Sequence, residues 1–240
     1  MEVLNRLREN SLTNQSSVQV HKYKCQTCKD TEFTYDEKTN TIRPCVCKDI
    51  NYYKHLLEKS GMAKAFQEKS FDNFFTKNRP EIITTAKNIA LNYVAKFDGL
   101  HSLAFIGQVG AGKTHLCIAV SRELMRKGIN VLYMQYRDTI TFLKQHMIDE
   151  QVYQKEITKH KTVQVLYIDD LYKGRITESD INIMFEIINH RYLNSLPVLI
   201  SSEFDCERIL QFDEAVGSRI LEMAKGNIIE FGEGLNYRLV

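Results

Sequence analysis

The sequence lacks the features that mark a membrane or exported protein. No stretch of its 240 residues approaches the roughly 18 consecutive apolar residues that a membrane-spanning helix needs. The segment Met1 to Ser17 contains no apolar run of the signal-peptide kind. The formal net charge of +2 is too small to indicate a nucleic acid or a membrane surface as a partner by bulk electrostatics. We therefore expect a cytoplasmic protein with no membrane partner.

The chain also lacks internal repeats, but its composition changes along its length. Residues 1–75 hold four of the six cysteines and many short polar segments, whereas the region after Pro80 alternates apolar runs with amphipathic helical patterns. The overall composition, 43% hydrophobic and 26% charged, suits one sizeable core and a smaller module. We place a boundary near Phe75 to Pro80, with an N-terminal domain at 1–75 and a second domain at 76–240.

The second region predicts an α/β fold. Apolar runs bounded by turn residues predict strands at 102–106, 130–134, 163–168, 198–202 and 228–231. The clearest helix between them is 178–193, which Thr177 and Asp180 would cap. Its apolar stripe consists of Ile181, Met184, Phe185, Ile188 and Tyr192. Strands that alternate with helices need crossover connections, so we expect a five-stranded parallel sheet between helices.

A glycine-rich loop follows the first of these strands and opens a helix. The loop Gly107 to Thr114 has the pattern GxxxxGK[ST], and Gly107, Gly110 and Gly112 would let its backbone N–H groups point at an anion. We expect Lys113 to reach the β- and γ-phosphates of ATP and the Thr114 hydroxyl to bind Mg²⁺. Ala111 and His115 complete the predicted nucleotide-binding set. The alternative is a glycine-rich connection in an unrelated α/β fold.

Two adjacent carboxylates end the strand predicted at 163–168. A buried strand would deliver Asp169 and Asp170 to the carboxyl edge of the sheet, where open α/β sheets bind ligands. Asp169 would hold Mg²⁺ and Asp170 would orient or deprotonate the attacking water. We expect Lys113 and Asp169 to meet at the tips of neighbouring strands. An ordinary turn or helix cap is the alternative for the acid pair taken alone.

Four cysteines in the N-terminal region have the spacing of metal ligands. The pairs Cys25/Cys28 and Cys45/Cys47 flank alternating residues around a turn, which predicts a zinc-ribbon-like hairpin. Cytosolic cysteines stay reduced, so zinc is favoured over disulfides, and a four-thiolate site would be structural. His21 is a possible substitute ligand, and four unrelated thiols are the alternative. Cys117 and Cys206 read as packing residues.

These motifs, in this order, resemble the DnaC/DnaI-type helicase loaders, especially their phage and prophage forms. The resemblance is carried by Gly107 to Thr114, Ile168 to Gly174, Ile200 to Glu203 and Gly217 to Ile220, and it covers most of the chain including the cysteine module. It implies an AAA+ P-loop ATPase core. The sequence ends soon after the last predicted strand, so we expect no C-terminal lid.

The resemblance also implies catalytic roles. Ser202 or Glu203 lies where AAA+ proteins sense the γ-phosphate, although the family often has Asn or Asp there. Arg219 matches the arginine that one subunit inserts into its neighbour's site, which implies a homo-oligomer joined through the ATP interface. The alternative for Arg219 is an ordinary charged residue on the surface of a helix. Asp170 stands where glutamate is common, so we expect slow hydrolysis, and Arg238 either approaches the nucleotide or is solvated.

The resemblance implies two macromolecular partners. One is a replicative DnaB-type helicase, for which the cysteine module and the helix 52–60 are the predicted docking surface. The other is single-stranded DNA, with Tyr136, Tyr153 and Tyr172 available for stacking. The candidate cations are Arg137, Lys144, Lys155, Lys159, Lys161 and Lys173, unless they form only a solvated face.

Two other functions compete with the loader. One is the ATPase helper of a transposition system, IstB-like, which has a similar core; the cysteine module favours the loader. The other is a metabolic P-loop kinase, which would need an acceptor pocket and a basic lid segment that the sequence does not indicate.

Overall fold

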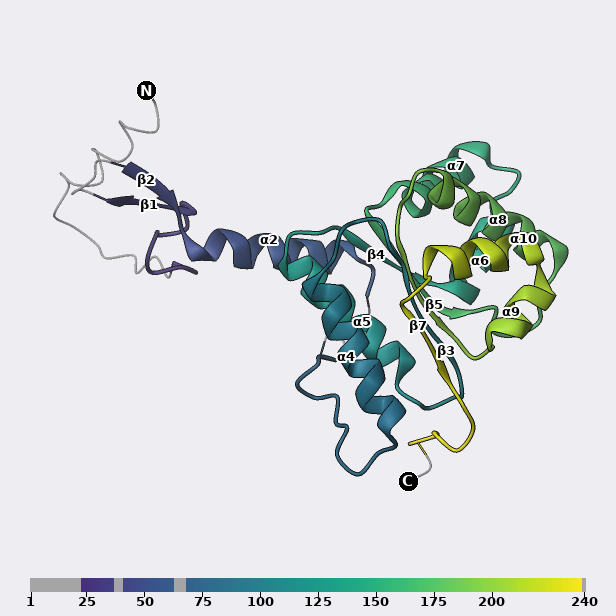
Figure 1. Cartoon of the computed structure of the whole chain (residues 1–240). Helices are drawn as coiled ribbons and strands as arrows, with labels where there is room; N and C mark the ends of the chain where they lie inside the picture. The colour runs from purple at the N-terminus through teal and green to yellow at the C-terminus, as the bar shows by residue number, and fades with distance from the viewer. Residues whose placement is uncertain (1–22, 37–40, 63–67, 239–240) are drawn as a thin grey trace. The chain divides into compact units, whose positions relative to one another are not determined.

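The computed structural model describes residues 23–36, 41–62 and 68–238 (Figure 1). The chain divides into two compact units, Met1–Lys48 and Asp49–Val240. Our sequence boundary near Phe75 lies inside the second unit, because Met62, Phe71 and Phe74 are buried in the core of that unit. The predictions for Met1 to Ser17 and for His21 lie outside the described residues.

The first unit contains the predicted hairpin. Strands β1 (Phe33–Asp36) and β2 (Thr41–Pro44) pair antiparallel, with Tyr35 opposite Ile42. Helix α2 (Val46–Lys59) begins in this unit and ends in the second, and it includes most of the helix predicted at 52–60.

The second unit is built on the predicted five-stranded parallel sheet. Its strands are β3 (Leu103–Gly107), β4 (Val131–Gln135), β5 (Val165–Leu171), β6 (Val198–Ser202) and β7 (Ile228–Phe231). They are arranged in the order β4-β5-β6-β3-β7, and every neighbouring pair is parallel. The carboxyl ends of β3, β5 and β6 therefore meet at one edge, where such sheets bind ligands.

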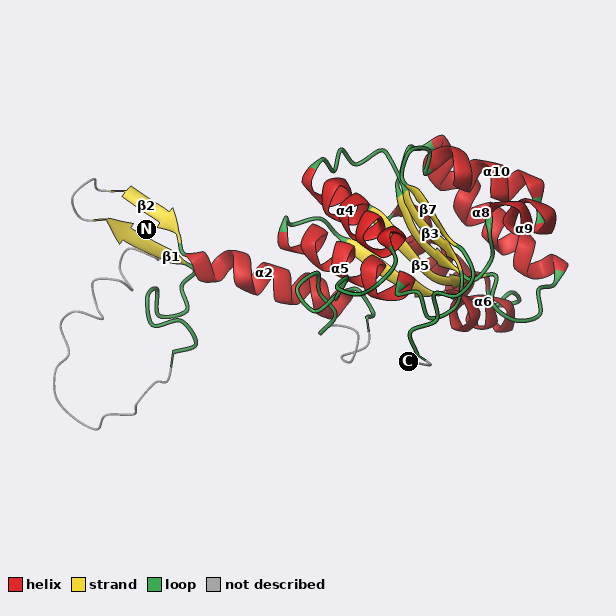
Figure 2. Cartoon of the chain, turned by 60° about the horizontal axis from the view of Figure 1, so that its bottom comes forward, coloured by secondary structure: helices red, strands yellow, loops and turns green. Residues whose placement is uncertain are grey.

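Helices cover both faces of this sheet (Figure 2). On one face lie α4 (Glu81–Ala95) and α5 (Lys113–Arg126). The other face is covered by α6 (Tyr136–Gln145), α7 (Glu150–Thr162), α8 (Glu178–Leu193), α9 (Cys206–Phe212) and α10 (Glu214–Met223). Alternate residues of β3 point into the two cores, with Phe105 on the α5 side and Ile106 on the α8 side. No described helix is both long and apolar enough to cross a bilayer.

The helix predicted at 178–193 has the observed bounds, but its buried face differs from the predicted stripe. The buried residues are Asp180, Ile183, Met184, Ile187, Ile188 and Arg191, whereas Phe185 is 39% exposed. The helix contacts both α7 and α10, so its buried face is set by these neighbours as well as by the sheet. Thr177 is the N-cap residue, but its hydroxyl donates a hydrogen bond to the Asp180 carboxylate and does not cap the helix backbone.

Candidate functional site

The glycine-rich loop connects β3 to α5, as the sequence predicts. Gly107, Gly110 and Gly112 all have positive φ angles, of +95°, +76° and +102°. L-residues with a side chain rarely adopt this conformation, so glycine is required for the path of the loop. At Gly107 a side chain is also excluded sterically, because an added Cβ would clash with the backbone carbonyl oxygen of Phe231 in β7.

Gly107→Ala is therefore expected to lower the free energy of unfolding by more than about 2 kcal/mol, since strain and a clash with backbone combine. Gly99→Ala is the matched control: Gly99 has a φ of +78° but its added Cβ would meet nothing within 4 Å. The control should cost only about 1 kcal/mol. Urea unfolding followed by circular dichroism measures both, and equal costs would contradict the steric argument.

Lys113 lies folded over the loop. Its ammonium donates hydrogen bonds to the carbonyl oxygens of Gly107 (2.7 Å) and Gln108 (2.6 Å). Burial lowers the pKa of Lys113 to about 8, and the nearby carboxylates of Glu203 and Asp170 partly offset this effect. The ammonium can exchange the two carbonyl oxygens for phosphate oxygens of a nucleotide held by the loop.

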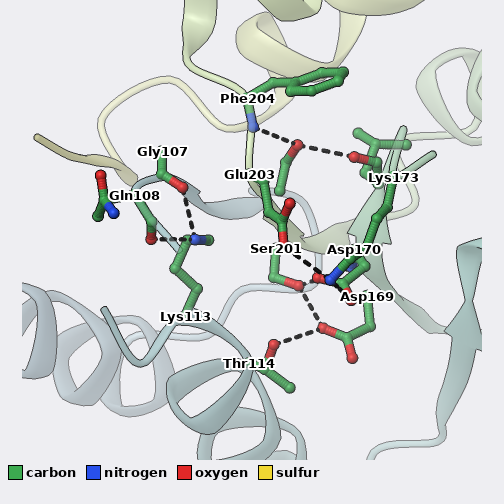
Figure 3. Close-up of polar contacts among 12 residues, drawn as sticks. Gly107, Gln108, Lys113, Thr114, Asp169, Asp170, Lys173, Ser201, Glu203 and Phe204 are labelled. Atoms are coloured by element: carbon green, nitrogen blue, oxygen red, sulfur yellow. Dashed lines mark hydrogen bonds and ion pairs between the residues drawn. The ribbon is translucent and has the colours of Figure 1, made fainter. Parts of the chain in front are cut away.

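Asp169 lies at the carboxyl end of β5 and bonds directly to the helix that the loop opens. The hydroxyl of Thr114 donates to Asp169 Oδ1 at 3.0 Å, although 55 positions separate the two residues in the chain (Figure 3). β6 lies between β3 and β5, so the expectation that Lys113 and Asp169 follow neighbouring strands is wrong. A serine of the intervening strand, Ser201, also donates to Asp169 Oδ1, at 2.5 Å.

Two tyrosines that the sequence reasoning missed complete the surroundings of this carboxylate. The hydroxyl of Tyr167 donates to Oδ1 at 2.7 Å and that of Tyr133 donates to Oδ2 at 3.0 Å. Strand alternation could have identified Tyr167, since side chains two positions apart on one strand share a face of the sheet. The side-chain atoms that contact Asp169 here are hydroxyl oxygens, and Asp169 itself supplies carboxylate oxygens. Oxygen atoms are the ligands that Mg²⁺ prefers.

Asp170 and Glu203 lie at the same edge and share one cation. Lys173 Nζ is 3.0 Å from Asp170 Oδ2 and 2.8 Å from Glu203 Oε1 (Figure 3). Ser202, the other predicted sensor, is buried and donates to the Leu171 carbonyl oxygen. Of the two predicted sensors, only Glu203 takes part in the charged cluster at the carboxyl edge of the sheet.

His115 faces the segment before α4. Its Nε2 lies 2.9 Å from the Ser70 carbonyl oxygen and 3.0 Å from Asn73 Oδ1, and burial lowers its pKa. The ring contacts Phe74 edge-on, with centroids 5.1 Å apart. His115 thus ties the residues before α4 to the start of α5.

A cavity of about 250 Å³ adjoins the loop on this side. Its lining residues are Asn73, Phe74, Phe75, Arg79, Gly110, Gly112, His115, Tyr237 and Arg238. The Arg79 guanidinium lies 3.5 Å over the ring of Tyr237 and donates to the Ala111 carbonyl oxygen at 3.2 Å. The sequence reasoning missed Phe74, Arg79 and Tyr237, because they belong to no motif. Arg238, for which an approach to the nucleotide was one of the two expectations, also lines this cavity.

Arg219, on α10, is not brought to the loop of its own chain. Its guanidinium donates to the Ala215 carbonyl oxygen at 2.7 Å and lies 5.4 Å from the centroid of Phe185 and 5.5 Å from that of Tyr192. These contacts hold it on the α8–α10 surface, so any action on a nucleotide would be on that of another subunit.

Most of the cations considered for single-stranded DNA have acidic partners within the chain. Arg137 and Lys144 pair with the fully buried Asp180. Lys159 pairs with Glu156, Lys161 with Glu186, and Lys173 with Asp170 and Glu203. Tyr136 and Tyr172 are fully buried, so the prediction that they stack on bases is wrong. Tyr153 is half-buried and donates to Glu186.

In the first unit, the four cysteines form one cluster. The sulfur atoms of Cys25, Cys28, Cys45 and Cys47 all lie within 4.8 Å of one another. The Cys25–Cys45 and Cys28–Cys47 sulfur pairs are 3.8 Å and 3.3 Å apart, and the first distance matches the ~3.8 Å that tetrahedral zinc with Zn–S bonds of about 2.3 Å requires. Hydrogen bonding by the Cys28 backbone N–H lowers the pKa of Cys25 to about 6, which favours the thiolate that a metal binds. The cluster therefore fits a structural zinc in a zinc-ribbon-like element.

Known proteins are similar to this chain in sequence. Residues 13–224 match the family model described as IstB-like ATP binding protein. The phage-like element PBSX protein XkdC of Bacillus subtilis (strain 168) is 34% identical over 222 residues, which are 87% of this chain and 82% of XkdC. The replicative helicase loader DnaC of Escherichia coli (strain K12) is 27% identical over 174 residues, covering 70% of this chain and 68% of DnaC.

A solved structure agrees with these sequence relatives. A crystal structure of the DnaC helicase loader superposes with a TM-score of 0.62 at 25% identity, over 71% of this chain and 100% of that one. The parallel sheet and its covering helices are thus those of the AAA+ fold expected from the sequence. The chain belongs to the IstB/DnaC family of AAA+ ATPases, the IstB-like ATP-binding proteins.

Proposed function

We propose that this ATPase is a replicative helicase loader that binds Mg-ATP in its second unit. The observation that carries the ATP site is the direct hydrogen bond between Thr114 and Asp169 beside the loop that holds Lys113. Mg²⁺ would be bound by Thr114 and Asp169, and the triphosphate by the loop from Gly107 to Thr114. The cavity beside Arg79 and Tyr237 has the position and size for the nucleobase.

Hydrolysis would use the groups at the carboxyl edge of the sheet. Asp170 is the proposed base or orienting group for water, and Glu203 is the proposed sensor of the terminal phosphate. Arg219 is the proposed trans-acting arginine, which the absence of a described contact between it and its own loop supports. ATP would then join two subunits, and its hydrolysis would loosen their interface.

The first unit, held by zinc on its four cysteines, would dock on a DnaB-type helicase, and the helix α2 would extend that surface. Similarity to DnaC over 70% of the chain supports this partner. For single-stranded DNA, internal ion pairs engage most of the candidate cations, whereas Lys155 is exposed. DNA would then be bound mainly by the assembled oligomer.

The test is a pull-down of the full chain with a DnaB-type helicase, with and without Mg-ATP. We expect ATP-dependent capture of the helicase by the full chain. A chain that captures the transposase of an IS21-type element and not the helicase would instead favour the transposition helper, which the IstB-like family model keeps as the second candidate.

Arg219→Ala is expected to leave nucleotide affinity within about twofold of the parent but to reduce ATP hydrolysis at least about tenfold and to remove ATP-dependent assembly. The reason is that the guanidinium would act only on a neighbouring subunit's nucleotide. Lys225→Ala, an exposed cation just after the same helix, is the control and should change neither property. Sedimentation with ATP and a phosphate-release assay measure the two effects, and unchanged values in Arg219→Ala would remove the trans-acting role.

A further inference from the structure

Lys173 has a role in the structure that no motif assigns to it. The chain turns sharply at the end of β5, because Asp170 and Tyr172 have positive φ angles of +55° and +64° and the Lys173 N–H donates to the Asp170 carbonyl oxygen. The turn places the ammonium between a carboxylate at the end of β5 and one directly after β6, Glu203. Figure 3 shows Glu203 with Lys113 on one side and Lys173 on the other.

Lys173 supplies one of the two positive charges at this edge of the sheet. Three carboxylates, Asp169, Asp170 and Glu203, face two ammonium groups, Lys113 and Lys173, which leaves a formal net charge of −1. Removing Lys173 would change this sum to −2. The side-chain hydrogen bond to Glu203 raises the pKa of Lys173, so the ammonium is charged at neutral pH.

The extra negative charge would act mainly on the γ-phosphate of a nucleotide. Lys113 belongs to the loop that holds the β-phosphate, and the γ-phosphate extends from there toward the strand ends. Glu203 and Asp170 are the groups whose charges act most strongly on Lys113, so they lie within electrostatic range of that position. Without Lys173, the carboxylates of Asp170 and Glu203 would repel the γ-phosphate of ATP, whereas ADP ends before it.

On the basis of the ATP site proposed above, we propose that Lys173 is the residue that lets this chain discriminate ATP from ADP, by neutralising Asp170 and Glu203 next to the γ-phosphate. Glu203 is tolerated beside the position of the γ-phosphate because this lysine accompanies it. Lys173 is thus a positioning and charge-balancing residue, since it acts on the nucleotide through the two carboxylates.

The experiment measures the affinity of the full-length, zinc-loaded chain for ADP and for a non-hydrolysable ATP analogue, each with Mg²⁺. In Lys173→Met we expect the affinity for the ATP analogue to fall at least about tenfold and that for ADP to change less than about twofold. Lys173→Arg should retain the parent ratio, because it keeps the charge. Adding Glu203→Gln to Lys173→Met should restore most of the affinity for the ATP analogue, since it removes one of the two repelling charges.

Lys159→Met is the matched control. Lys159 also pairs with an acid three residues away, Glu156, and its side chain is 50% exposed against 47% for Lys173. This variant should leave both affinities unchanged. The melting temperature of each variant separates a folding defect from a loss of discrimination.

Each outcome decides the role of Lys173. Equal losses for ADP and the ATP analogue in Lys173→Met, no loss at all, or failure of Glu203→Gln to rescue would overturn it. A parent chain that binds neither nucleotide would overturn the ATP site as well, whereas a parent that binds both while Lys173→Met keeps the parent ratio would overturn only the discrimination.

Discussion

Lys113→Ala is expected to weaken Mg-ATP binding by at least about a thousandfold, to the point where titration calorimetry detects none. In the proposed site, the Lys113 ammonium is the cation that the loop itself supplies to the phosphates, and its present partners are the carbonyl oxygens of Gly107 and Gln108. Removing it leaves those carbonyl oxygens facing the triphosphate with no positive charge between them. Because their repulsion adds to the lost attraction, the loss should exceed that of one ordinary hydrogen bond.

The control for this variant is Lys96→Ala, which removes an exposed lysine at the end of α4. It should keep the parent affinity. A Lys113→Ala protein with unchanged circular dichroism and parent-like ATP binding would show that the nucleotide lies elsewhere, and the proposed function would fall with it.

Cys28→Ser is expected to release the bound zinc and to separate the paired strands β1 and β2. Among the described residues of the first unit only Cys28 and Cys45 are buried, so the unit has no apolar core other than the cluster itself. A two-stranded hairpin of this size is at best marginally stable in water. Structural zinc contributes on the order of 10 kcal/mol to the folding of such modules, and three thiolates with a hydroxyl bind it far less tightly.

Metal analysis and amide hydrogen exchange measure this effect. The exchange protection of β1 and β2 should disappear, whereas nucleotide affinity should stay within about twofold of the parent, because the residues of the proposed nucleotide site all belong to the second unit. Cys206→Ser is the matched control, since Cys206 begins α9 outside the cluster. Zinc retention in Cys28→Ser together with preserved protection would rule out the four-cysteine site.

The sequence predicted the framework of the second unit because the signals involved are local. Each predicted strand is an apolar run bounded by turn residues, and each was found within a few positions of its expected bounds; only β5 extends appreciably, from Ile168 to Leu171. The loop from Gly107 to Thr114 and the cysteine pairs are likewise short patterns whose chemistry depends on spacing. These patterns were enough to predict a phosphate-binding loop and a cluster of four thiols.

The errors arose where strand order or neighbouring helices decide the outcome. Nothing local places β6 between β3 and β5, so Ser201 was not recognised as a partner of Asp169. Nothing local shows that Tyr136 and Tyr172 are buried, because tyrosine suits both a core and a binding surface.

The sequence by itself determined that this protein has a phosphate loop, an acidic strand end and a four-thiol module, because covalent spacing and side-chain chemistry are sufficient for each. Only the tertiary structure decided which groups surround them: the hydroxyls on Asp169, the pairing of Lys173 with Glu203 and the aromatic cavity beside Arg79. These contacts join residues far apart in the chain, and their partners are set by the order in which five strands pack against two layers of helices.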